Sequence, residues 1–323
     1  MLFRSSNQTA SNMIAIGNGA LYTEASSAYA VAIGTNAYFT HNAAENYGSV
    51  VVGFYAGRSA TTGIDNTFVG GYAGRNHTTG SYNVFLGASA GISNTTASNN
   101  TAVGYQAAYS NSTGLDCIAV GYQAYRNGTA SYNYAIGCYA MSGGITTGVQ
   151  NIAFGRYSLS SLTGGSYNNA LGDYSLQNLT TGNYNVALGM YALNATTTAS
   201  NNTAVGYQAG YSNTTGGITA FGFEAGYGNT TGTYNNALGY RALRTNTTGA
   251  YNVAVGTALF NNTTGSYNIG IGWQALDNNT TASNNTAVGY QAGYTNTTGN
   301  ITAMGYKALS AHTTGSNNTA FGE

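Results

Sequence analysis

Charged residues are scarce in this chain of 323 residues, because Lys, Arg, Asp and Glu together make up 5% of it. A typical soluble domain contains roughly 25%. Lys+Arg and Asp+Glu contribute 8 residues each, so the formal net charge is zero, and neither sign clusters along the sequence. Such a chain has no electrostatic means of holding nucleic acid or an anionic membrane surface. We therefore expect neither of them as a partner.

Long apolar runs are also missing, although 42% of the residues are hydrophobic. Gly, Asn, Thr or Ser interrupts every few positions, and no run approaches the ~20 residues that a membrane-spanning helix needs. Residues 1–10 lack the basic region and apolar stretch of a signal peptide. We expect no membrane insertion.

Proline is absent from the whole chain. Proline would remove a backbone donor from a β-ladder, so its absence fits a continuous sheet in which almost every N–H is paired. A chain rich in Gly, Asn and Thr is often disordered. The regular spacing of the alanines and branched apolar residues argues against disorder here.

What the sequence has in abundance is one short repeat, best seen in residues 202–216. Its central residue, Gly206, has equivalents at a spacing of 16 to 19 residues, most often 17, which makes 19 copies. These glycines stand at 17, 34, 53, 70, 87, 104, 121, 137, 155, 172, 189, 206, 222, 239, 256, 272, 289, 305 and 322. A fixed short period is the signature of a solenoid, in which each repeat adds one layer. The sequence thus predicts an all-β parallel β-solenoid of about 19 coils.

The coil positions are numbered so that the marker glycine is position 5. Position 4, Val205 in this copy, is bulky and apolar in all 19 copies, and position 3, here Ala204, is alanine in 15. Successive strand residues face opposite sides, so both faces of this strand carry apolar side chains. One face would line the coil interior, and the other would meet a second row of strands or another chain, where alanine allows close approach. Ala209, at position 8, marks a second apolar column, and glycine at position 5 would allow a tight bend between two short strands.

Polar columns follow the same period. Position 1 is Asn in 13 of 19 copies, including Asn202, and asparagines stacked in successive layers can form a ladder of amide hydrogen bonds. Tyrosine is frequent just before position 1 and just after the marker glycine, as at Tyr184 and Tyr207, and such columns can stack their rings with the hydroxyls in water. Sequons such as Asn213-Thr-Thr and Asn296-Thr-Thr fall in turns, where we interpret Asn and Thr as turn residues rather than glycan sites.

The domain organisation predicted from the repeat is one continuous body. Residues 1–12 do not match the repeat and are interpreted as an N-terminal cap or linker. Residues 13–323 form the repeat domain, with irregular coils over 13–53 and regular coils over 54–322. The chain stops within a coil, which would expose strand edges, and we expect a fragment, a processed product or an end covered by another subunit.

The submotif Asn-Thr-Ala-Val-Gly-x-x-Ala, at 202–209 and 285–292, resembles the head repeats of trimeric autotransporter adhesins (YadA-like heads), which are similar to repeats in bacteriophage tail fibres. The resemblance covers roughly residues 12–322. It implies a left-handed parallel β-roll with three chains packed around an axis. A trimer also fits the small core that a coil of about 17 residues can bury alone. This coil is longer than the usual adhesin-head coil, and no heptad stalk or C-terminal membrane barrel is seen, which favours a tail fibre or a fragment.

Catalysis, metal binding and cofactors find little support in the sequence. His41, His77 and His312 are scattered, and the last two precede Thr-Thr-Gly turns, so we interpret them as exposed loop residues. No acid lies in register with another as a glycosidase pair would require. Cys117 and Cys138 occupy positions 1 and 6 of successive layers, an offset of ~16 Å along the strands. That is too far for a disulfide, so both thiols are expected to be free.

The first functional hypothesis is a structural and adhesive fibre, an extracellular or virion-borne homotrimer that positions or provides binding to a surface glycan. Aromatic faces and amides suit sugars, which makes Tyr207, Tyr240 and Tyr290 the candidate contacts. The alternatives are a self-assembling extracellular filament, an ice-binding solenoid based on the Thr pairs of 13 coils, and a polysaccharide-degrading tail spike. Of these hypotheses, only the spike would be an enzyme.

Overall fold

The computed structural model describes residues 13–23, 29–41 and 48–322. The predicted cap over 1–12 lies outside these residues. The chain divides into two compact units, Met1–Gly164 and Gly165–Glu323, each built from the same kind of coil. Each described coil contributes one short strand, and the strands are parallel, as the repeat predicted.

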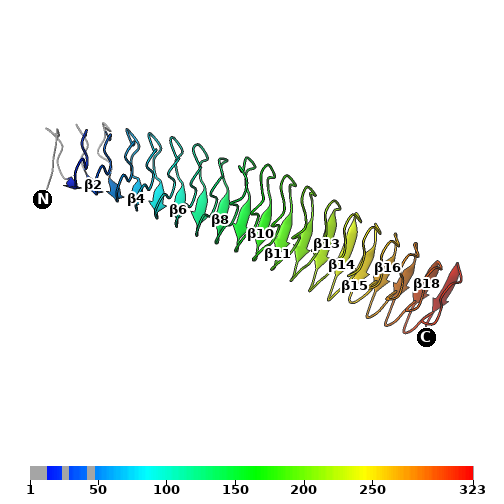
Figure 1. Ribbon diagram of the computed structural model, residues 1–323. Helices are drawn as coiled ribbons and strands as arrows, with labels where there is room; N and C mark the ends of the chain where they lie inside the picture. Colours follow the sequence, from blue (N-terminus) through cyan, green and yellow to red (C-terminus); the bar gives the residue numbers. More distant parts are fainter. Residues whose placement is uncertain (1–12, 24–28, 42–47, 323) are drawn as a thin grey trace. The chain divides into compact units, whose positions relative to one another are not determined.

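In the first unit, successive strands lie side by side and form one wall, and the rest of each coil returns along the opposite wall (Figure 1). The strands of this unit are β1 (Ile14–Ile16), β2 (Ala30–Ile33), β3 (Ser49–Val52), β4 (Thr67–Val69), β5 (Val84–Leu86), β6 (Thr101–Val103), β7 (Ile118–Val120), β8 (Tyr134–Ile136) and β9 (Ile152–Phe154).

The second unit repeats this arrangement with a regular register, in which Ala170 pairs with Ala187 and Ala187 with Ala204. Its strands are β10 (Asn169–Leu171), β11 (Val186–Leu188), β12 (Thr203–Val205), β13 (Ile218–Phe221), β14 (Asn235–Leu238), β15 (Val253–Val255), β16 (Ile269–Ile271), β17 (Thr286–Val288), β18 (Ile301–Met304) and β19 (Asn318–Phe321).

The return segment of each described coil consists of consecutive turns. The prediction of a second short strand after the marker glycine is therefore wrong for these coils. Residues with left-handed backbone recur along it, for example Gln208 (φ 53°), Gly210 (φ 59°) and Leu193 (φ 51°). Alternating left-handed residues curl the backbone instead of extending it. The N–H groups of this wall still pair with the next coil, as from Gly210 N to Ala225 O at 2.9 Å.

The core lies between the two walls and is narrow. Ala204 and Ala209 are fully buried and stand for the two alanine columns at positions 3 and 8. Where position 3 is enlarged to Phe68 or Phe85, the return wall carries Gly74 or Gly91, and a Cβ at either glycine would lie within about 3.1 Å of the ring. Large and small residues therefore alternate across the core to keep its width constant.

The marker glycine lets successive coils approach each other. Gly206 has φ +134°, and a Cβ added there would lie 2.4 Å from the carbonyl oxygen of Gly222 in the next coil. No side chain fits at that distance, which explains why glycine recurs at position 5 in each repeat.

The predicted asparagine ladder is confirmed. Asn202 is fully buried, and its Nδ2 donates to Asn185 Oδ1 at 2.8 Å, while its own Oδ1 accepts from Ile218 N at 2.9 Å. The sequence analysis missed a second ladder at position 12, where Asn229 Nδ2 donates to Asn213 Oδ1 at 3.0 Å and Asn246 Nδ2 to Asn229 Oδ1 at 2.7 Å. The interior thus combines two alanine columns and the buried leucines of the return wall with two amide columns, which satisfy the buried backbone at the corners.

Candidate functional surface

The outer face of the strand wall is the largest candidate surface. Positions 2 and 4 point away from the core, so the bulky apolar column that includes Val205 lies on the outside, and position 3, which is alanine in most coils, faces inward. The expected close approach at the alanine face is made by the return wall of the same coil, not by another chain. The sequence could not distinguish these faces because both are apolar.

The outward side chains are substantially exposed and none is charged. In the second unit the large apolar side chains among them that are at least about a third exposed are Leu171, Val186, Leu188, Phe221, Leu238, Ile269, Ile271, Met304 and Phe321. In the first unit they include Ile14, Ile16, Val50, Val84, Leu86, Ile118, Tyr134, Ile152 and Phe154. A hollow of about 320 Å³ lies on this face beside Phe221, Leu238 and Val255. Parallel strands are ordinarily covered on both faces, so this face lacks half of its usual packing.

A column of aromatic rings follows the strand wall at position 6. Tyr207 stacks on Phe223 with 5.3 Å between ring centroids, and Phe223 stacks on Tyr240 at 5.4 Å. Tyr290 stacks on Tyr306 at 5.3 Å. All three sequence candidates, Tyr207, Tyr240 and Tyr290, are therefore exposed members of one column, with the rings stacked as the sequence analysis expected.

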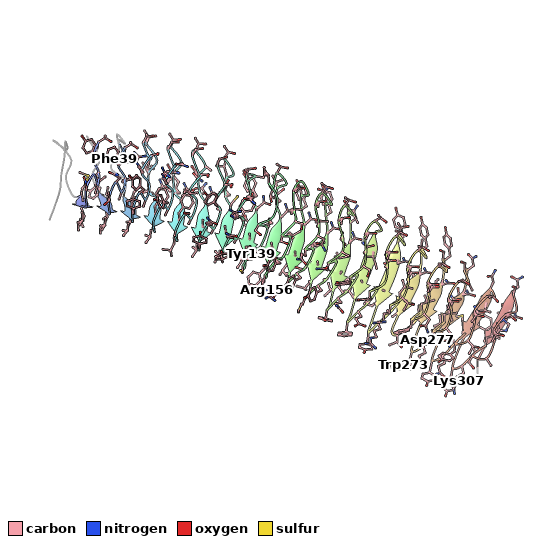
Figure 2. All side chains as sticks on the ribbon, viewed as in Figure 1. Phe39, Tyr139, Arg156, Trp273, Asp277 and Lys307 are labelled. Carbon is pink, nitrogen blue, oxygen red and sulfur yellow. The ribbon has the colours of Figure 1, made fainter. Side chains whose placement is uncertain are left out.

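The column is interrupted between Tyr240 and Trp273 by Thr257 at position 6. A pocket of about 200 Å³ opens there and is lined by Tyr240, Thr257, Trp273 and Asp277, together with polar and aromatic neighbours. Trp273 and Asp277 belong to the same coil and lie near each other in Figure 2. The sequence analysis missed this pocket, although the interruption of the aromatic column is visible in the sequence.

Beside the column, Glu224 forms ion pairs with two arginines. Arg241 Nε donates to Glu224 Oε2 at 2.9 Å, and Arg244 Nε donates to the same oxygen at 2.7 Å. The hydrogen bonds and charges of the two arginines hold the pKa of Glu224 below its ordinary value, against the opposing effect of its desolvation. The carboxylate of Glu224 is thus engaged by two arginines.

The prediction of an exposed loop residue is wrong for His77, which is 0% exposed, and His41 is also buried, at 3%. Counted from their marker glycines, all three histidines occupy position 12, the place of the second asparagine ladder. His312 there has Nε2 2.8 Å from Gly315 O. The imidazole replaces an asparagine amide at an inward corner, which the adjacent Thr-Thr-Gly turn did not reveal.

His77 lies fully inside its coil. Its Nε2 is 2.7 Å from Gly80 O, and its Nδ1 lies 2.9 Å from the side chain of Asn94. Asn94 Nδ2 has no hydrogen-bond partner in the described chain. A neutral His77 ring with its proton on Nε2 donates to Gly80 O, and its Nδ1 is then an acceptor. When the Asn94 amide is oriented so that its Nδ2 faces His77 Nδ1, both of these atoms have a hydrogen-bond partner. Burial lowers the pKa of His77, in keeping with a neutral ring.

Both cysteines are free, as predicted. Cys117 takes the place of an asparagine in the first ladder, where its backbone N–H donates to Asn100 Oδ1 at 2.9 Å. Burial raises the pKa of the Cys117 thiol to about 11, so it stays protonated and unreactive.

The first threonine of most Thr pairs donates its hydroxyl to the next coil. Thr214 Oγ1 donates to Thr230 O at 2.9 Å, and Thr230 Oγ1 donates to Thr247 O at 2.9 Å. These hydroxyls stabilise the stacking of the coils and do not form a free array. The asparagines of the sequons at Asn213 and Asn296 are fully buried, in agreement with their interpretation as turn residues.

No group of three or more His, Cys, Asp or Glu side chains suited to a metal ion occurs in residues 13–23, 29–41 and 48–322. Within the same residues, no helix is long and apolar enough to cross a bilayer. The chain matches no protein-family model, and no curated protein is significantly similar to it in sequence.

Proposed function

We propose that this protein is a structural fibre component in which copies of the chain pack through the outer face of the strand wall. The observation that carries the proposal is the outer face of the strand wall, which is uncharged at positions 2 and 4, bulky and apolar throughout position 4, and exposed in a single chain. A copy of the same chain is the partner that fits best, because its side chains repeat at the same spacing of ~4.8 Å per layer. Three chains is the number that the resemblance to adhesin heads implies.

We further propose that the assembly is extracellular, on a phage tail fibre or a cell-surface adhesin, and that it positions or provides binding to a surface glycan. The support for glycan binding is the exposed aromatic column at position 6, whose rings offer apolar faces beside polar side chains. An enzymatic role is not part of the proposal, since Glu224 is engaged in ion pairs and Asp277 has no second acid in its pocket.

The test is the native mass of the purified protein in solution, measured together with electron microscopy of the same sample. A discrete three-chain particle supports the trimeric fibre. Open-ended fibres support the alternative of a self-assembling filament. A strict monomer contradicts both.

Ice binding is disfavoured, because the threonine hydroxyls donate to backbone carbonyls of the next coil. Thermal hysteresis of the purified protein would support ice binding instead. Depolymerisation of a polysaccharide by the protein would support the spike.

A further inference from the structure

The pocket at Thr257 arises because its coil is one residue short. The return segment here reads Gly256-Thr-Ala-Leu-Phe260, whereas other coils place two residues between the marker glycine and the buried alanine. Gly256 has φ +91°, against +136° at both Gly239 and Gly289. The shortened segment brings Ala258 directly into the core, where it is fully buried. The coil therefore presents one small side chain, Thr257, where its neighbours present a ring.

The missing ring leaves a slot that is lined by the aromatic side chains of Tyr240 and Trp273. Tyr240 and Trp273 belong to coils on either side of the Thr257 coil and are 53% and 55% exposed. Two layers at ~4.8 Å each separate them by roughly 9–10 Å. A ring that packs on both faces needs about 3.5–4 Å on each side, or roughly 7–8 Å. The slot has room for one ring.

Polar groups surround this slot. Asp277 is half-buried, its carboxylate has no ion pair or hydrogen bond among the described residues, and desolvation raises its pKa. Gln274 also lines the pocket, and its Oε1 accepts from Gln291 Nε2 at 2.8 Å, which leaves its own Nε2 as the donor available to a ligand. Thr257 Oγ1 forms the floor and accepts from Gln274 N at 3.3 Å. An acceptor, a donor and a hydroxyl thus surround the two rings.

The charges of the pocket restrict the ligand. Asp277 would repel a phosphate or a carboxylate. Arg241 also lines the pocket, with its guanidinium 5.0 Å from the centre of the Tyr240 ring, and would repel an ammonium group. The two arginines, Glu224 and Asp277 sum to zero charge. A neutral ligand with several hydroxyl groups satisfies these conditions, because hydroxyls donate to the carboxylate and accept from the amide.

We propose that the slot between Tyr240 and Trp273 binds one ring of a neutral sugar, with Asp277 and Gln274 holding its hydroxyl groups. The apolar C–H faces of the sugar ring pack on the electron-rich faces of the two side chains. The proposal rests on the adhesive part of the proposed function and specifies its ligand class. The site lies within a single chain, so it does not depend on how many chains assemble.

Trp273 is the single tryptophan of the chain, so its fluorescence reports on this pocket alone. The probes are the methyl pyranosides of glucose, galactose, mannose and N-acetylglucosamine, each titrated into the full chain, with ligand-observed NMR as a second readout. We expect at least one of them to shift the Trp273 emission with half-saturation in the millimolar range, as for small ligands of about a dozen heavy atoms. Methyl glucuronide and choline serve as the anionic and cationic probes and are expected not to bind.

Three variants separate the slot from the aromatic column in general. Thr257→Tyr supplies the ring found in other coils and fills the slot, so binding should fall at least tenfold while the coil keeps its fold. Asp277→Asn keeps the shape but removes the charged acceptor and should weaken binding several-fold. Tyr207→Ala removes an exposed ring of the same column outside the pocket and should leave binding unchanged.

The proposal is overturned if no neutral pyranoside binds, if only choline or glucuronide binds, or if Thr257→Tyr binds as the unmodified chain does. The native mass, measured on the same samples, distinguishes this failure from that of the fibre. A trimer that binds none of the sugars retains the structural role and loses the site. A monomer that binds a sugar retains the site and loses the fibre.

Discussion

At the scale of single residues, buried amides organise this protein. Asn202 illustrates the arrangement, since its side chain joins the coil before it, through Asn185, to the coil after it, through Ile218. A carboxamide supplies a donor and an acceptor from one small group, which is what a layered interior with repeating backbone groups requires. Cys117 shows the weaker substitute, with its thiol donating to Ala130 O at 3.2 Å.

Replacing Asn202 by Ala should lower the free energy of unfolding by about 1–3 kcal/mol, because the N–H of Ile218 and the amide of Asn213 lose a buried acceptor. Chemical denaturation followed by circular dichroism measures the change. Asn236→Ala is the matched control, since Asn236 lies on the outer face of β14 and is exposed. Equal losses in the two variants would contradict the role of the ladder.

Replacing His77 by Asn should remove a pH dependence of stability. The pKa of His77 is lowered in the folded chain from its ordinary 6.5, so the unfolded chain binds more protons as the pH falls. The contribution of His77 to the free energy of unfolding is therefore fully present above the ordinary histidine pKa, and it decreases as the pH drops through and below that value. The asparagine variant restores the residue usual at position 12 and should show a flatter curve.

The measurement is the melting temperature of both proteins from about pH 8 to about pH 5, a range that spans the unfolded pKa of histidine. His41 and His312 are present in both proteins and act as an internal reference. An unchanged slope after the His77→Asn substitution would show that other groups cause the pH dependence.

At the scale of the element, one coil is defined by a strand, a glycine and a curled return segment. The three-residue strand is too short to be stable alone and is held by its neighbours in the ladder. The glycine carbonyls stack from coil to coil at a distance that excludes any Cβ. Stability of a coil is therefore mostly a property of its contacts with adjacent coils.

Substituting Gly206 by Ala should destabilise its unit by at least about 2–3 kcal/mol, because a Cβ at φ +134° is strained and overlaps the carbonyl of Gly222. Thermal unfolding and the yield of soluble protein measure the effect. Gly217→Ala is the control in the same unit, since the nearest atom to a Cβ there, Asn201 O, is 4.0 Å away. Similar behaviour of the two variants would disprove the close-approach argument.

At the scale of the whole molecule, the deciding feature is the outer face of the strand wall. Its side chains are uncharged in both units and are bulky and apolar throughout position 4, whereas position 2 alternates between apolar residues and Thr or Asn. Exposed apolar area of this regularity is typical of an interaction surface. The scarcity of charge elsewhere on the chain removes electrostatic guidance, so shape and repeat spacing would have to select the partner.

Substituting Leu188 by Lys places a charge in the middle of that face and should weaken self-association roughly 10- to 100-fold, because each charge would have to be desolvated at the interface. Sedimentation or native mass spectrometry over a range of concentrations measures the shift toward the monomer. Thr198→Lys adds the same charge at an exposed turn and should leave the assembly intact. Dissociation by the turn variant alone would place the interface elsewhere.

The sequence by itself determined the repeat, the parallel ladder, the position of the first asparagine ladder, the stacking of the tyrosines and the free thiols. These features depend on spacing, since identical residues one period apart must become neighbours in a layered fold. The glycine at position 5 was also recognisable, because glycine is required wherever the backbones approach too closely for a Cβ.

Only the tertiary structure decided which side of the strand faces inward, because two apolar faces give the same pattern in the sequence. Val205 and Leu188 point outward, because position 3 of the strand faces inward and is filled by alanine, while fully buried leucines of the return wall, such as Leu193, fill the space opposite. The burial of His77 and the slot beside Trp273 were hidden for a related reason: both depend on what the neighbouring coils place around the residue. Periodicity specifies neighbours along the stack, and the packing across the coil specifies what each side chain meets.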